Sequence, residues 1–205
     1  MKNYIFILLF LLSAEFVFGQ LKIVKQAKLP PSNEGVAEFI RVNKFDYALI
    51  SWGTSNWLGV EDNFYCLLKQ HRKYYLAKIV STTYAVKGPI DHLTVFQKEL
   101  KNGQVDSLFK ALKVDSAFLY TQKQLNTLPK EGCSWLEDGK TWGFNIMDGG
   151  DTYLTQLSEG KLFSLEKYAP KYLFENCSPF VPEFKMLKGM VNTEDKLTEA
   201  VRREL

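Results

Sequence analysis

The amino-acid sequence predicts an α+β protein with two antiparallel β-meanders, about six strands in all, and packed helices in the middle and at the C-terminus. Two parts of the chain alternate apolar and polar residues with the period of a strand. The segments between and after them repeat apolar residues every three or four positions, as amphipathic helices do. Strands grouped with strands and helices with helices favour antiparallel pairing over a parallel α/β sheet.

The first 19 residues are typical of a cleavable signal peptide. Lys2 supplies a positive charge, Tyr4 to Leu12 form an uncharged apolar run, and Val17-Phe18-Gly19 precede the expected cut at Gln20. The run is too short to span a bilayer, which needs about 20 apolar residues. We therefore expect a periplasmic or extracellular protein without a membrane span, the alternative being an uncleaved anchor.

The mature chain is expected to consist of a linker and one domain. Residues 20–35 include the pair Pro30-Pro31 and are assigned to the linker. Residues 36–205 are expected to form a single α+β domain, which is long enough to bury a core. Its first element is predicted to be a short helix with an apolar face over 36–40.

The first meander is the clearest pattern in the sequence. Alternating residues predict strands over 46–52, 63–69 and 73–80. In the second strand Phe64 and Cys66 share a face. About four polar residues between the second and third strands predict a hairpin turn.

The middle of the chain is predicted to be helical and to lead into the second meander. A helix is expected over 104–113, and a short helix or an irregular connection over 115–125. Strands are then expected over 142–146, 153–157 and 161–166, separated by glycine-containing turns. The two meanders resemble each other slightly, which an internal duplication or chance convergence would both explain.

The C-terminal region is predicted to form three helices. The first starts at Pro170 and stops before Ser178. A second amphipathic helix is expected over 184–191. The third would be capped by Asn192 or Thr193, so that the acidic residues at 194 and 195 lie near the positive end of its dipole.

Three cysteines in an exported chain make a disulfide the first expectation. Cys133 and Cys177 both flank predicted loops, and we expect them to pair. Closing that loop would stabilise the fold by about 4 kcal/mol in the chain-entropy model. Cys66 lies in an apolar strand and is expected to be a buried free thiol. The alternative is three reduced, buried thiols.

Charge and motifs exclude several classes of function. The net charge is only +3, and the densest basic stretch, 69–73, falls at a predicted hairpin turn, so nucleic acid is not an expected partner. His71 lies in that turn, and His92 has no nucleophile signature beside it. Asp148 and Asp151 flank two glycines, which favours a tight turn over a calcium loop. We predict no catalytic residue, metal ligand or cofactor.

Aromatic residues supply the only candidates for ligand binding. Trp52, Trp57 and Tyr74 belong to a group of aromatic side chains around the meanders that could stack on sugar rings or anchor a protein partner. The alternative is that most of them fill the core. Trp57, in a loop, is the one most expected to be exposed.

Several short segments resemble a loose group of uncharacterised exported bacterial proteins. They are Ser51-Trp52-Gly53, residues 59–65 and residues 168–172, together with the Asp138-Gly139 turn before an aromatic strand and a cysteine after the tyrosine-rich helix. The resemblance extends over most of the mature chain. It implies export and carries no activity.

These observations predict a non-enzymatic binding or interaction module of the periplasm or cell exterior, with an unknown protein or glycan as its partner. One alternative is a hydrolase that acts on envelope polymers or glycans through carboxylates, although no acid pair can be chosen from the sequence. The other is an inhibitor or immunity-type protein that blocks one enzyme.

Overall fold

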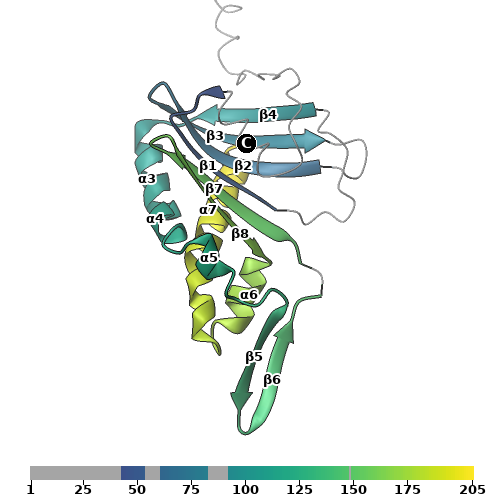
Figure 1. Cartoon of the computed structure of the whole chain (residues 1–205). Helices are drawn as coiled ribbons and strands as arrows, with labels where there is room; N and C mark the ends of the chain where they lie inside the picture. Colours follow the sequence, from purple (N-terminus) through teal and green to yellow (C-terminus); the bar gives the residue numbers. More distant parts are fainter. Residues whose placement is uncertain (1–42, 54–60, 83–91, 148) are drawn as a thin grey trace, which may run out of the picture.

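A six-stranded antiparallel sheet forms the centre of the part of the molecule that the structure describes (Figure 1). The computed structural model describes residues 43–53, 61–82, 92–147 and 149–205. The strands lie in the order β4-β3-β2-β1-β7-β8. Their bounds are β1 (Tyr47–Gly53), β2 (Glu61–Gln70), β3 (Lys73–Thr82), β4 (His92–Glu99), β7 (Asp151–Ser158) and β8 (Lys161–Tyr168). The predicted signal peptide, the linker, the helix at 36–40 and Trp57 lie outside the described residues.

Helices pack on one face of this sheet. They are α3 (Asn102–Leu112), α4 (Val114–Ala117), α5 (Gln122–Leu125), α6 (Pro170–Cys177), the 3₁₀ helix η2 (Pro182–Leu187) and α7 (Lys188–Glu204). Leu49, Leu67 and Leu76 are register partners on three adjacent strands, and all three are buried in the core that these helices share with the sheet. The α+β class predicted from the sequence is therefore confirmed.

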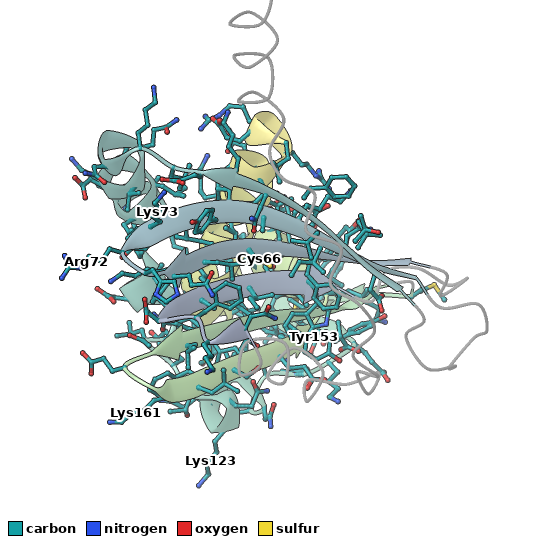
Figure 2. The ribbon with its side chains drawn as sticks, turned by 90° about the horizontal axis from the view of Figure 1, so that it is seen from above. Cys66, Arg72, Lys73, Lys123, Tyr153 and Lys161 are labelled. Atoms are coloured by element: carbon teal, nitrogen blue, oxygen red, sulfur yellow. A yellow bond between two sulfur atoms is a disulfide. The ribbon has the colours of Figure 1, made fainter. Side chains whose placement is uncertain are left out.

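The opposite face of the sheet carries a second apolar cluster. Figure 2 looks onto this face, where Cys66 and Tyr153 are labelled. Ala48, Ile50 and Cys66 are buried there, while their strand neighbours belong to the helix-covered core. Burial on both faces explains why β1 has apolar side chains on both of them, with Tyr47 and Leu49 on one face and Ala48 and Ile50 on the other.

The first meander has one more strand and a tighter turn than predicted. β1, β2 and β3 lie where the alternation places them, and β4 follows as an edge strand that the sequence analysis missed. The turn between β2 and β3 contains two residues, His71 and Arg72, rather than about four. Both have positive φ, 50° and 68°, which is the backbone of the two-residue turns that match the twist of a hairpin.

The second predicted meander is divided between two sheets. β7 and β8 join the main sheet because β7 pairs with β1. β6 (Lys140–Asn145) pairs instead with β5 (Gly132–Glu137), a strand that the sequence did not predict, and this hairpin projects from the rest of the molecule (Figure 1). A Cβ at Gly132 would overlap the Phe144 carbonyl, so the start of β5 requires glycine.

The projecting hairpin is attached to α6 by a disulfide. Cys133 and Cys177 are bonded, with their Cα atoms 5.9 Å apart, and Cys66 is a buried free thiol. Beside the bond the rings of Trp135 and Phe180 stack with their centroids 4.1 Å apart. A two-stranded hairpin is marginal on its own in water, so these two contacts account for its fixed attachment.

The C-terminal region contains one long helix where two were predicted. η2 covers 182–187, and α7 then runs without a break through Asn192 and Thr193. Thr193 does not cap a helix. Its buried hydroxyl donates a hydrogen bond of 2.9 Å to the Leu112 carbonyl at the end of α3. Where a short helix or an irregular connection was predicted over 115–125, the structure has two short helices, α4 and α5.

Lys167 on β8 holds the segment that follows α5. Its side chain is buried, and its ammonium donates to the carbonyls of Leu128 at 2.7 Å, Pro129 at 3.2 Å and Leu125 at 3.4 Å. Burial, and secondarily the charge of Lys130, lowers the pKa of Lys167 to about 8. The ammonium thus replaces its lost hydration with three backbone acceptors.

We expect Lys167→Met to lower the free energy of unfolding by about 3 kcal/mol, because two buried carbonyls and one partly buried carbonyl lose their donor while the aliphatic stem is retained. Lys161→Met, at an exposed position on the same strand, is the matched control and should change stability by less than about 0.5 kcal/mol. Urea unfolding at neutral pH measures both. Equal effects of the two substitutions would show that the three hydrogen bonds contribute nothing.

Candidate functional site

Two of the aromatic residues singled out from the sequence, Trp52 and Tyr74, lie on opposite faces of the sheet. Trp52 is 7% exposed, and its ring stacks on Tyr153 with centroids 4.7 Å apart. Tyr74 contacts the edge of Phe109, and the Lys69 ammonium lies 5.5 Å from its ring centroid. Both rings pack against neighbouring aromatic rings, and Trp57 lies outside the described residues.

A polar cleft lies at the end of the sheet where β1 ends and where β2, β7 and α6 begin. Its volume is about 390 Å³, and α7 forms one of its walls. Its polar and aromatic lining comes from Ser51, Asn63, Tyr65, Asp151, Thr152, Lys171, Tyr172, Glu194, Thr198 and Arg202. Trp52 borders the same cleft with its buried ring.

Helix α7 contributes a row of three functional groups to this cleft. Glu194, Thr198 and Arg202 are spaced four residues apart, so they lie on one face of the helix. The sequence analysis had placed Glu194 in the first turn of a helix, where it would only complement the dipole. In the unbroken α7 it lies in the interior, and its carboxyl belongs to the cleft.

Glu194 is the most unusual group in the cleft. Its side chain is partly buried, and this burial, assisted by the charge of Asp195 and opposed by that of Lys171, raises its pKa to about 7. No described residue donates a hydrogen bond to its carboxyl or forms an ion pair with it. A partly desolvated carboxyl without a partner is characteristic of a functional site.

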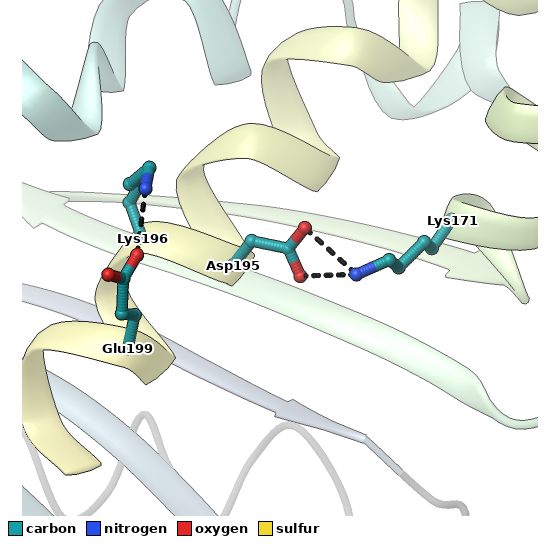
Figure 3. A network of polar contacts seen from close by, with 4 residues as sticks. All are labelled: Lys171, Asp195, Lys196 and Glu199. Carbon is teal, nitrogen blue, oxygen red and sulfur yellow. Dashed lines mark hydrogen bonds and ion pairs between the residues drawn. The ribbon is translucent and has the colours of Figure 1, made fainter.

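The two cations that line the cleft with Glu194, Lys171 and Arg202, both contact other groups. Lys171 donates to both carboxylate oxygens of Asp195, at 3.1 and 3.0 Å (Figure 3). Arg202 donates to the Tyr65 hydroxyl at 3.2 Å, with its guanidinium carbon 5.4 Å from the centre of that ring. Each cation therefore has a contact that does not involve Glu194.

The opposite wall of the cleft contains a second carboxylate and an exposed ring. Asp151 lies at the start of β7, and Tyr172, in the first turn of α6, is 56% exposed. The glycine pair before Asp151 was predicted as a tight turn. The structure shows the Gly149 amide donating to the Tyr168 hydroxyl at 2.8 Å, and a Cβ at 149 would crowd that ring. Asp148 lies outside the described residues.

A groove between α3 and α7 is a weaker candidate for a functional site than the cleft. Its volume is about 440 Å³, and its lining includes Leu100 and Leu108. The charged groups on its α7 side pair with one another or with β4. Lys196 bonds Glu199 at 2.7 Å (Figure 3), and Glu204 accepts a 2.7 Å bond from Lys98. The cleft around Glu194 is therefore the better candidate.

The described part of the chain contains neither a metal-ligating cluster nor a membrane-spanning helix. No group of three or more His, Cys, Asp or Glu side chains gathers there in a way that could hold a metal ion. None of the described helices is both long and apolar enough to cross a membrane. His71 is exposed in its turn, and the side chain of His92 is not described.

No family model, no curated protein and no solved structure matches this chain. What the protein does must therefore be argued from the cleft. The resemblance to exported bacterial proteins stays an expectation from the sequence.

Stability should depend on the protonation of Glu194. The folded protein retains the proton up to about pH 7, whereas the unfolded chain releases it near 4.5, the ordinary pKa of a glutamate. The folded state holds more protons in this window, so the free energy of unfolding falls as pH rises through it, by at most about 1.4 kcal/mol per pH unit. We expect Glu194→Gln to remove this fall in urea unfolding between those pH values.

The matched control is Glu199→Gln on the same helix. The hydrogen bond with Lys196 lowers the pKa of Glu199, so the protonation of Glu199 affects the free energy of unfolding only below the range of pH 4.5 to 7. The fall in stability across that range should therefore remain in Glu199→Gln. Identical pH dependence in wild type and Glu194→Gln would contradict the assignment.

Proposed function

We propose that the protein is an exported, non-enzymatic binding module that holds a saccharide in the cleft between α6, α7 and the ends of β1, β2 and β7. The observation that carries the proposal is the unpartnered, partly buried carboxyl of Glu194 in a cleft rich in hydrogen-bonding groups. Export is supported by the signal-peptide pattern of residues 1–19.

The chemistry of the lining favours a sugar over an apolar ligand. Sugar hydroxyls both donate and accept hydrogen bonds, and the cleft supplies acceptors in its carboxylates, donors in Arg202, and groups of both kinds in Asn63 and Thr198. The exposed ring of Tyr172 offers a flat surface for a sugar face. A volume of about 390 Å³ lies in the usual range of small-molecule sites.

We expect Tyr172→Ala to weaken saccharide binding by about tenfold without loss of thermal stability, because an exposed aromatic platform is removed. The measurement is binding of residues 20–205 to an array of envelope oligosaccharides, followed by calorimetry on the best ligand. Trp142→Ala is the matched control, since Trp142 is exposed on the projecting hairpin, away from the cleft lining.

The same pair of variants distinguishes the inhibitor alternative. Stoichiometric capture of one enzyme that depends on Trp142 and not on Tyr172, without saccharide binding, would replace the proposal by an inhibitory role for the hairpin.

A glycan-directed hydrolase is the second candidate, and one observation favours it. Glu194 and Asp151 line the same cleft, and burial keeps Glu194 protonated up to about pH 7, as a general acid requires. A binding module leaves a bound oligosaccharide intact during prolonged incubation. Release of reducing ends, abolished by both Glu194→Gln and Asp151→Asn, would instead establish the hydrolase.

A further inference from the structure

We propose that the saccharide in this cleft carries a protonated amine, as an amino sugar does, and that its ammonium pairs with the carboxylate of Glu194. The inference deepens the proposed function and rests on it.

Glu194 is the acid of the cleft lining to which the described residues supply neither a hydrogen bond nor an ion pair. Lys171 and Asp195 form a closed ion pair, with both carboxylate oxygens within 3.1 Å of the ammonium. Arg202 lies two helical turns from Glu194, about 12 Å along the axis, and contacts Tyr65. Asp151 also lines the cleft, on the β7 side, and already interacts with another group. The titratable hydroxyls of Tyr65 and Tyr172 complete the set.

An ammonium group matches the ionised form of Glu194 better than a hydroxyl or an amide does. It has three donors and a full charge, whereas beside a neutral group the partly buried carboxyl must either stay protonated or carry a charge without a counter-ion. Thr198, one turn beyond Glu194 on the same face of α7, supplies a hydroxyl oxygen for a second donor. A charge-assisted hydrogen bond is also stronger than a neutral one. A sugar that carries the amine should therefore bind more tightly than an otherwise identical sugar without it.

Three disaccharides of the same linkage provide the test. They are the β-1,4 dimer of glucosamine, its diacetylated form, and cellobiose, which has a hydroxyl in place of each amine. Binding to residues 20–205 is measured by calorimetry at about pH 7. We expect the glucosamine dimer to bind at least tenfold more tightly than the other two, as about 1.5 kcal/mol from a charged hydrogen bond implies. Glu194→Gln should reduce this preference to within about twofold.

Glu199→Gln is the matched control, because Glu199 lies on the same helix but is paired with Lys196 and absent from the cleft lining. It should keep the preference for the glucosamine dimer. Equal binding of all three disaccharides would overturn the inference while leaving a saccharide-binding module in place. A preference that persists in Glu194→Gln would overturn the role of Glu194. Failure of all three to bind would overturn the amino-sugar inference, and the oligosaccharide array with Tyr172→Ala then tests the binding module separately.

Discussion

The position of α7 depends on a close backbone contact at Gly189. A Cβ at this residue would overlap the Ser116 carbonyl of α4, so only glycine lets the two helices approach as they do. One turn later the Thr193 hydroxyl bonds the last carbonyl of α3. Leu197 and Val201 then bury the helix against the sheet. These contacts place the face of α7 that carries Glu194, Thr198 and Arg202 against the ends of the strands. The cleft depends on this placement of α7.

Lys167 and Glu194 are both withdrawn from water, but they differ in how the surrounding groups satisfy them. Lys167 is removed from water, but three backbone carbonyls surround its ammonium, so its charge holds a loop in place. Glu194 is also withdrawn from solvent, yet no described group satisfies it. Burying a carboxyl without a partner costs stability. Selection retains such a cost where binding or catalysis benefits from it, which is why the proposals centre on Glu194.

The sequence predicted those parts of the fold that depend on local pattern. Alternation located β1, β2 and β3, and the positions of Cys133 and Cys177 beside loops led to the pair that the structure contains. β4 and β5 were missed because an edge strand and a projecting hairpin bury little and so lack a clear apolar period. Asn192-Thr193 resembled a helix cap, but burial of Thr193 against α3 overrides that local preference.

The cleft could not be predicted because its residues come from distant parts of the chain. Tyr65, Asp151, Tyr172 and Glu194 meet only after β7 pairs with β1 and α7 crosses the helix-covered face. Each has an ordinary local role. Tyr65 is an aromatic residue in a strand, Asp151 follows a turn, Tyr172 lies at the start of a helix, and Glu194 is an acid on the surface of a helix. The four-residue spacing of Glu194, Thr198 and Arg202 was visible in the sequence, but a break predicted just before Glu194 hid the continuity of α7.

The central claim is that Glu194 is a desolvated carboxyl in an accessible cleft. A carbon-detected NMR titration of the side-chain carboxyl groups tests it most directly, with the Glu194 signal assigned by its loss in Glu194→Gln. We expect a midpoint near 7 for Glu194, and a midpoint below the ordinary glutamate value for Glu199, whose hydrogen bond with Lys196 lowers its pKa. A Glu194 midpoint near 4.5, the value of a solvated glutamate, would contradict the account.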